Sequence, residues 1–154
     1  MTKDNYKVVA DNRRARHDYF IKETLEAGII LMGTEVKSLR EGKGSIKESH
    51  AGEKNGELYL INAHIDDYSA SGYIKHPARR FRKLLLRKRE RNKLLGAIKK
   101  EGITLVPLQI YFNHRGIAKV LIGLAAGKKK HDKRESEKER DWKRNQSRLL
   151  RDKG

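Results

Sequence analysis

Basic side chains interleaved with aromatic rings and histidines are the residues of this chain whose types and spacing could do chemistry. They gather in RRARHDYF at 13–20, HPARRFRK at 76–83 and KKKHDKR at 128–134. Flat rings beside cations suit the splayed bases and the phosphates of structured RNA. Nothing in the chain has the pattern of a helix-turn-helix or a zinc finger, so RNA is favoured over DNA.

Patterns typical of enzymes are mostly absent. The chain has six histidines and no cysteine, and it lacks the H-x-E and H-E-x-x-H spacings of zinc sites. EGKGSIK lacks the residue order of a phosphate loop, and no G-x-S-x-G elbow occurs. His17 and Asp18 could form a base with its orienting carboxylate, but on a strand their side chains would diverge. We expect no enzymatic activity and no cofactor.

Net charge indicates the class of partner. Lysine and arginine number 37 against 20 acidic residues, which gives a net charge of +17. Such a surface attracts polyanions, so nucleic acid is the expected partner. A basic membrane-surface protein is the competing class, but no basic helix with a broad apolar face is present. Without cysteine, a signal-like apolar segment or a membrane-length apolar run, we expect a cytoplasmic protein.

The elements that must position these residues follow from the hydrophobic pattern. Residues 17–21 predict the first strand of the body, and residues 28–33 predict another strand bounded by glycines. A short helix should follow, capped by Thr34 and ended by Gly42.

The second half of the body predicts a hairpin, a strand leading into a helix, and two further strands. Residues 46–66 form the hairpin, with its turn at Asn55-Gly56, where both residues tolerate positive φ. Residues 82–102 begin as a strand and become a helix, and 103–112 and 116–126 form the last two strands.

Alternation in the last two strands predicts which residues face the core. Val106, Leu108, Ile110 and Phe112 should point inward, and Pro107 should mark an edge or a bulge. Short strands with turn signals and two short helices suggest a small closed barrel.

Residues 128–154 differ in kind from this body. They hold 12 basic and 6 acidic side chains and have almost nothing to bury. On a helix, His131, Trp142 and Leu149 would share one face. We expect a tail that is disordered alone and folds on a partner. A solvating charged tail with an incidental tryptophan is the alternative.

Several blocks, in one order along residues 12–151, resemble a known family. The blocks are NRRARHDYFI, EAGIILMGTEVKSLREGKGS, RKLLLRKRE, GITLVPLQIYF, and GLAAGKKKHDKRES followed by RDWKR. Together they resemble the small protein B family of SsrA-binding proteins. The resemblance implies a mostly β fold with α, namely a small OB-like closed β-barrel with two or three flanking helices. Residues 1–127 would be this RNA-binding domain, and 128–154 a basic C-terminal tail that becomes helical on the ribosome.

The resemblance also implies a function and partners. The barrel would bind the tRNA-like domain of transfer-messenger RNA and deliver it to the A site of stalled 70S ribosomes for trans-translation. The tail would meet small-subunit ribosomal RNA in the decoding centre and enter the empty mRNA channel. Elongation factor Tu and alanyl-tRNA synthetase, which act on the same RNA, are further expected partners. We expect a monomer that does not bind membranes.

Two sets of site residues follow. The residues expected to bind RNA are Asn12, Arg13, Arg16, His17, Tyr19, Glu26, Lys37, Arg79, Arg80, Lys83 and Leu85. Those expected in the decoding centre and the mRNA channel are Lys128, Lys129, His131, Asp132, Lys133, Arg134, Trp142, Leu149 and Leu150. No catalytic residue and no metal ligand are expected.

Alternatives stay open at this point. Leu85 could be a core residue of its strand, and Glu26 could accept from a guanine edge or brace a nearby arginine. A structural ribosomal protein or a general RNA chaperone would have a similar composition. A metal-dependent ribonuclease using His17, His131 and nearby aspartates is the rival from another class.

Overall fold

The computed structural model describes residues 6–68, 75–100 and 102–127. The predicted tail, residues 128–154, lies outside the described residues, and so do the nine candidates assigned to the decoding centre and the mRNA channel. Within the described part of the chain, no helix is long and apolar enough to cross a membrane.

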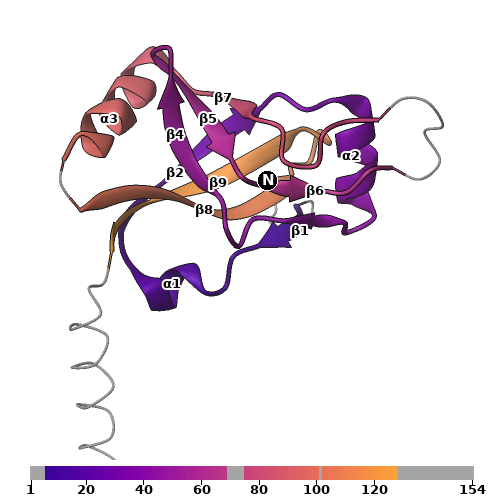
Figure 1. The fold of residues 1–154 in the computed structure, drawn as a ribbon, viewed down its shortest axis with the longest axis horizontal. Coiled ribbons are helices and arrows are strands. Elements are labelled where there is room, and N and C mark those ends of the chain that lie inside the picture. Colours follow the sequence, from indigo (N-terminus) through magenta and orange to yellow (C-terminus); the bar gives the residue numbers. More distant parts are fainter. Residues whose placement is uncertain (1–5, 69–74, 101, 128–154) are drawn as a thin grey trace, which may run out of the picture.

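The described residues form nine strands and three helices (Figure 1). In chain order they are β1 (Lys7–Asp11), α1 (Ala15–Asp18), β2 (Tyr19–Ile29), α2 (Gly33–Arg40), β3 (Gly44–Ser45), β4 (His50–Lys54), β5 (Glu57–Ile61), β6 (His64–Ile65), β7 (Arg82–Leu85), α3 (Lys88–Ile98), β8 (Ile103–Phe112) and β9 (Ala118–Gly127). The prediction of a mostly β fold with helices beside the sheet is confirmed.

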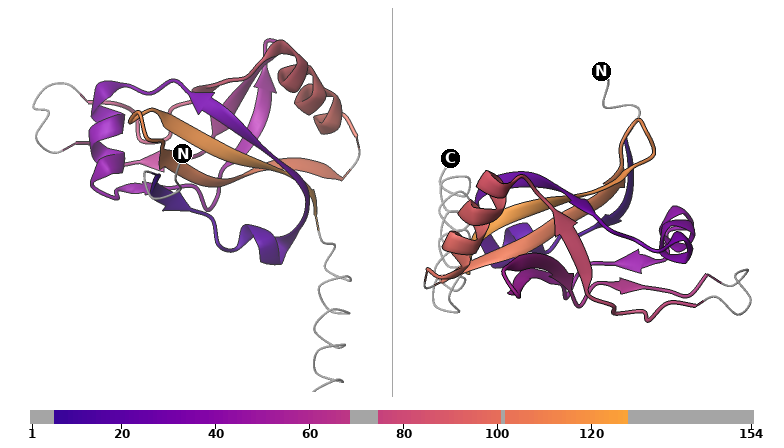
Figure 2. Two further views of the ribbon diagram at one scale, coloured as in Figure 1. Left: turned by 180° about the vertical axis from the view of Figure 1, so that it is seen from behind. Right: turned by 90° about the horizontal axis from the view of Figure 1, so that it is seen from above.

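The main sheet is antiparallel and closes on itself. Its strand order is β1-β8-β4-β5-β7-β2-β9, and β9 also pairs with β8, so six strands form a ring to which β1 is added. Strands β3 and β6 make a separate pair. Helices α2 and α3 lie at opposite ends of the sheet (Figure 2). Inward-facing aliphatic side chains such as Leu58, Leu60, Val120 and Ile122 fill the ring and are fully buried, because alternate residues of a strand point to one face.

Several predicted elements are confirmed. The hairpin of β4 and β5 turns at Asn55 and Gly56, whose φ angles are 55° and 78°. The change from strand to helix occurs between β7 and α3, and β8 and β9 form the last hairpin. Pro107 lies at a β-bulge, since the register of β8 against β9 shifts between Pro107 and Gln109.

The bulge divides the inward-facing residues of β8 between two cores. All four predicted residues are buried, but Ile110 and Phe112 pack in the main core. Val106 and Leu108 instead pack with Ala15 in a smaller cluster beneath α1. The extra residue of a bulge changes which face the following side chains meet.

The prediction that residues 17–21 form the first strand is wrong. Strand β1 precedes it and pairs with β8. His17 and Asp18 belong to α1, and their backbone N–H groups each donate to the carbonyl of Arg14 at 3.0 Å. Strand β1 was not predicted because most of its side chains are exposed. Its sequence therefore has little of the apolar alternation that indicates a strand.

The strand predicted at 28–33 is also wrong in its bounds. Gly28 and Ile29 are instead the end of β2, one long strand that begins at Tyr19. The polar stretch KETLE continues the strand because β2 pairs along most of its length with β9. An exposed outer face tolerates such side chains.

Thr34 is not the cap of α2. The helix begins after Met32, whose backbone N–H donates to Glu35 Oε1 at 2.8 Å. The hydroxyl of Thr34 instead lies 2.8 Å from Nδ1 of buried His76. His76 Nε2 lies 3.0 Å from the carbonyl oxygen of Ile65, so this histidine joins α2 to β6.

Candidate nucleic-acid interface

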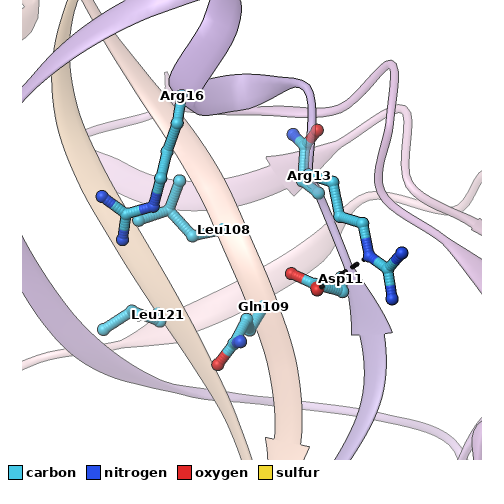
Figure 3. Close-up of a pocket in the computed structure, with 7 residues that line it drawn as sticks. Asp11, Arg13, Arg16, Leu108, Gln109 and Leu121 are labelled. Carbon is cyan, nitrogen blue, oxygen red and sulfur yellow. Dashed lines mark ion pairs between the residues drawn. The ribbon is translucent and has the colours of Figure 1, made fainter.

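The N-terminal block of candidates surrounds a hollow beside α1. Arg13 and Arg16 line it together with Leu108, Gln109 and Leu121, and it encloses about 300 Å³. Figure 3 shows Arg16 reaching from α1 past Leu108, while Arg13 lies on the other side and turns toward Asp11. Arg13 Nε is 3.7 Å from Asp11 Oδ2, and its side chain is 92% exposed. Two guanidinium groups therefore flank an open hollow, whose lining also includes the carboxylate of Asp11, and they can meet an anionic group from solvent.

Asn12 positions this block from inside the fold. It is only 5% exposed, its Nδ2 donates to the carbonyl of Pro107 at 3.1 Å, and its backbone N–H donates to Leu108 at 2.8 Å. Its Oδ1 is buried and has no hydrogen-bond partner among the described residues. Asn12 thus fixes the turn that leads into α1 and keeps one acceptor unused.

A second hollow lies on the other side of Asn12. It encloses about 260 Å³, and its lining includes Tyr19, His50 and Lys47. His17 itself is exposed on α1. The structure therefore brings the N-terminal candidates Asn12, Arg13, Arg16, His17 and Tyr19 together around one short helix.

Leu85 and Glu26 lie together elsewhere, in a wider hollow between β2, β7 and β9. It encloses about 530 Å³ and is also lined by Arg87 and Lys119. Leu85 is 49% exposed, so it is a surface residue and the core interpretation is wrong. Gly28 lies opposite, where a Cβ atom would come within 3.2 Å of Leu85 Cβ. The missing side chain of Gly28 leaves the room that Leu85 occupies.

Glu26 is held by a tyrosine that sequence reasoning missed. The hydroxyl of Tyr111 donates to Glu26 Oε2. Burial, followed by this hydrogen bond and the nearby carboxylate, raises the pKa of Tyr111 well above its ordinary value, so it stays a neutral donor. Tyr6 stacks on the Tyr111 ring at 5.3 Å between centroids. No local signal marks this contact, because Glu26 and Tyr111 are 85 residues apart.

Three further candidates, Lys37, Arg79 and Arg80, already interact with other side chains of the fold. Arg80 Nη2 is 2.6 Å from Glu35 Oε1. Arg79 donates to Asn62 Oδ1 at 2.6 Å. The ammonium of Lys37 lies 5.5 Å from the centre of the Tyr68 ring. These cations can add to the positive field, but Arg80 mainly stabilises the fold.

Buried Glu35 explains the position of Arg80. Arg82 is fully buried and its Nε lies 2.5 Å from Glu35 Oε2. Burial alone would raise the pKa of Glu35, but the hydrogen bonds from Arg80 and Met32 and the charge of Arg82 outweigh it, so the pKa is lowered. This ion-pair network fastens α2 to β7.

Apart from Lys37, Arg79, Arg80 and Lys83, the candidates therefore form two separated groups rather than one site. Tyr19 and Glu26 are seven residues apart on β2, which corresponds to roughly 23 Å along a strand. Lys83 lies on β7 two residues before Leu85 and pairs with Tyr59 of β5, outside the hollow of the second group. Among the described residues, no group of three or more His, Asp or Glu side chains could hold a metal ion. The spacing suits a long, negatively charged ligand better than a small one.

Comparisons with known proteins agree over almost the whole chain. Residues 9–152 match the family model described as SmpB protein. The SsrA-binding protein of Sphingomonas elodea is 60% identical over 153 residues, which cover 99% of this chain and 96% of that protein. The SsrA-binding protein of Paramagnetospirillum magneticum is 62% identical over 147 residues, which cover 96% of each chain.

A solved structure is similar as well. It is described as "tmRNA-SmpB: a journey to the center of the bacterial ribosome" and is 57% identical to this chain, with a TM-score of 0.68. The likeness covers 81% of this chain and 91% of the other. The agreement in sequence thus extends to the arrangement of strands and helices.

Proposed function

Since the chain belongs to the SmpB family, the non-enzymatic tmRNA-binding proteins of trans-translation, we propose that it grips the tRNA-like domain of transfer-messenger RNA with the two groups of residues described above. The observation that carries this proposal is the hollow in which exposed Leu85 lies beside Glu26 and Lys119. An apolar side chain, a held carboxylate and a cation can meet a base face, a base-edge donor and a phosphate of one folded RNA.

The first group, around α1, would contact a different part of the same RNA. Arg13 and Arg16 offer guanidinium groups to phosphates, and Tyr19 and His17 offer rings to bases. Roughly 23 Å between the groups along β2 is comparable to the width of an RNA helix, so both can lie against one compact RNA. We interpret the closed ring of strands as an OB-like barrel that holds the two groups at this separation.

We further propose that residues 128–154 work on the ribosome rather than in binding the tRNA-like domain. Their net charge of +6 supports contact with ribosomal RNA. The complex would enter the vacant A site of a stalled 70S ribosome, with Lys128 to Arg134 near the decoding centre. Trp142, Leu149 and Leu150 would lie deeper in the mRNA channel.

The test is binding of the full chain to the tRNA-like domain and to an unstructured RNA of equal length at the same salt. We expect tighter binding to the tRNA-like domain. If about 6 phosphates are neutralised, log K should fall with log salt at a slope of very roughly −4 to −5. Equal affinity for both RNAs, or a flat salt response, would contradict shape-dependent RNA binding.

Sequencing the RNA that co-purifies with the protein separates this function from its alternative. We expect transfer-messenger RNA to dominate and the protein to sediment with stalled ribosomes. A structural ribosomal protein would instead be stoichiometric on every ribosome.

A further inference from the structure

The outer face of β4 and β5, beside the start of β7, carries two neighbouring aromatic rings, Tyr59 and Phe81. Antiparallel pairing places Gly52 beside Tyr59 and Tyr59 beside Lys83. The inward neighbours Leu58, Leu60, Arg82 and Leu84 are buried, so the intervening residues point out of the ring. We call this outward set the aromatic face, and it consists of His50, Lys54, Tyr59, Ile61, Phe81 and Lys83.

Solvent reaches both rings of the aromatic face, since Phe81 is exposed and Tyr59 is half-buried. Phe81 is 45% exposed, although its side chain is large and apolar. The Tyr59 and Phe81 rings lie 6.5 Å apart between centroids and are tilted by 49°. Lys54 Nζ lies 5.2 Å from the centre of the Phe81 ring. Two rings and a cation thus meet on one open patch of sheet.

The charge of the face selects an anionic partner. Lys54 and Lys83 both belong to it. The carboxylate of Glu57, beside Lys54 in the register, lies 3.0 Å from Arg91 and is neutralised there. Glu53 alternates to the other side of β4, opposite Leu58. Rings flanked by cations are the combination that stacks unpaired bases while holding their phosphates.

The face is continuous with the hollow of Leu85 and Glu26. Phe81, Lys83 and Leu85 alternate with the buried Arg82 and Leu84, so all three point to the same side of the chain at β7. Strand β7 therefore leads from the aromatic rings directly to the hollow. A chain of RNA leaving the hollow along β7 would meet the aromatic face next.

We propose that Tyr59 and Phe81 stack on an unpaired base of the transfer-messenger RNA bound at that hollow, while Lys54 and Lys83 hold the adjoining phosphates. The proposal rests on the proposed function, because the RNA is the same. It adds a contact through the rings of Tyr59 and Phe81, which line none of the hollows described above. Stacking is largely indifferent to base identity, so it would strengthen binding without restricting sequence.

The test compares Phe81→Leu with Phe81→Trp in the full chain. Leucine keeps the apolar surface but removes the ring, whereas tryptophan keeps a ring that can stack. Phe81→Leu should bind the tRNA-like domain about 5- to 100-fold more weakly, and Phe81→Trp should bind within about twofold of the parent protein. The salt slope should stay the same in both, since no charge changes. Unchanged affinity of Phe81→Leu, or equal losses in both variants, overturns the proposal.

Photo-crosslinking of the unmodified protein to transfer-messenger RNA provides a second measurement that does not depend on how a variant folds. A crosslink between a base of that RNA and Tyr59 or Phe81 is the expected result. Crosslinks from these residues only to ribosomal RNA or to a protein overturn the proposal. Glu26→Gln distinguishes base stacking on the aromatic face from the proposed function. If Glu26→Gln weakens RNA binding while Phe81→Leu does not, the stacking proposal is wrong and the proposed function is retained. If the parent protein itself shows no preference for the tRNA-like domain, the proposed function fails first.

Discussion

At the scale of single residues, the candidate interface depends on side chains that the fold holds in unusual positions. Leu85 is an exposed leucine in a strand, next to a glycine that makes room for it. Glu26 is an acid in a strongly basic protein, and Tyr111 donates a hydrogen bond to one of its oxygens. A carboxylate fixed in this way has lost rotamer freedom before RNA arrives, which lowers the cost of binding.

Tyr111→Phe tests whether this positioning matters. The ring and its stacking on Tyr6 remain, and only the hydrogen bond to Glu26 is lost. We expect affinity for the tRNA-like domain to fall about 2- to 10-fold, the equivalent of one net hydrogen bond. In a Glu26→Gln background the same change should have a smaller effect. Additive losses in the double variant, measured in one binding assay, would show that Tyr111 acts independently of Glu26.

Leu85→Ala tests the surface position of Leu85. Because the side chain is half exposed, the free energy of unfolding should change by no more than about 0.5 kcal/mol. Affinity for the tRNA-like domain should nevertheless drop, since the apolar contact with the RNA is removed. Leu84→Ala is the matched control. Leu84 is only 3% exposed, so this substitution should lower the free energy of unfolding by about 2–5 kcal/mol. A large loss of stability in Leu85→Ala would show instead that Leu85 packs as a core residue.

At the scale of elements, the ion pairs of Glu35 hold α2 against β7 at the end of the sheet opposite α3. Glu35 and Arg82 are both fully buried and lie 2.5 Å apart. Such a pair is costly to break from one side, because the remaining charge has no partner in the interior. It also fixes Arg80 and the path of the chain into the strand that carries Lys83 and Leu85.

Glu35→Gln should therefore cost about 3–5 kcal/mol of unfolding free energy at neutral pH. Acid should reduce the difference between the variant and the parent protein. The pKa of Glu35 is lowered from 4.5 in the folded state, so its contribution is complete above pH 4.5 and is lost as pH falls through the folded pKa. Urea unfolding across this range measures the effect. A difference that is the same at neutral and acid pH would exclude Glu35 as its source.

At the scale of the whole molecule, the body and residues 128–154 should have separable roles. The ring of strands contains the described core, and residues 128–154 carry few apolar side chains that could add to it. Residues that bind the tRNA-like domain are proposed to lie in the body. Those that act on the ribosome are proposed to follow Gly127.

A chain truncated after Gly127 should melt almost as the full chain does and should still bind the tRNA-like domain. It should lose only the non-specific attraction of the +6 charge of the removed residues. On stalled ribosomes it should fail to support peptide transfer to the RNA, and Trp142→Ala with Leu149→Ala in the full chain should partly reproduce that failure. A truncated protein that tags stalled peptides at the full rate, or that does not fold, would contradict this division.

Local signals in the sequence were enough for the elements whose determinants are local. The Asn55-Gly56 turn follows from two residues that tolerate positive φ. The β8–β9 hairpin, the bulge at Pro107 and the passage from β7 to α3 follow from short-range periodicity and from the missing N–H of proline. The basic and aromatic blocks likewise indicated RNA as the partner before any fold was known.

Only the tertiary structure decided which face of each strand is covered and which distant side chains meet. Strand β1 exists because β8 offers it a partner, and the polar middle of β2 is a strand because β9 pairs with it. Leu85 has the sequence context of a core residue but lies outside, since its neighbours Arg82 and Leu84 take the inward positions. Alternation in a sequence divides residues into two faces without saying which one is buried. Burial, and pairs such as Tyr111 with Glu26, depend on packing between segments far apart in the chain.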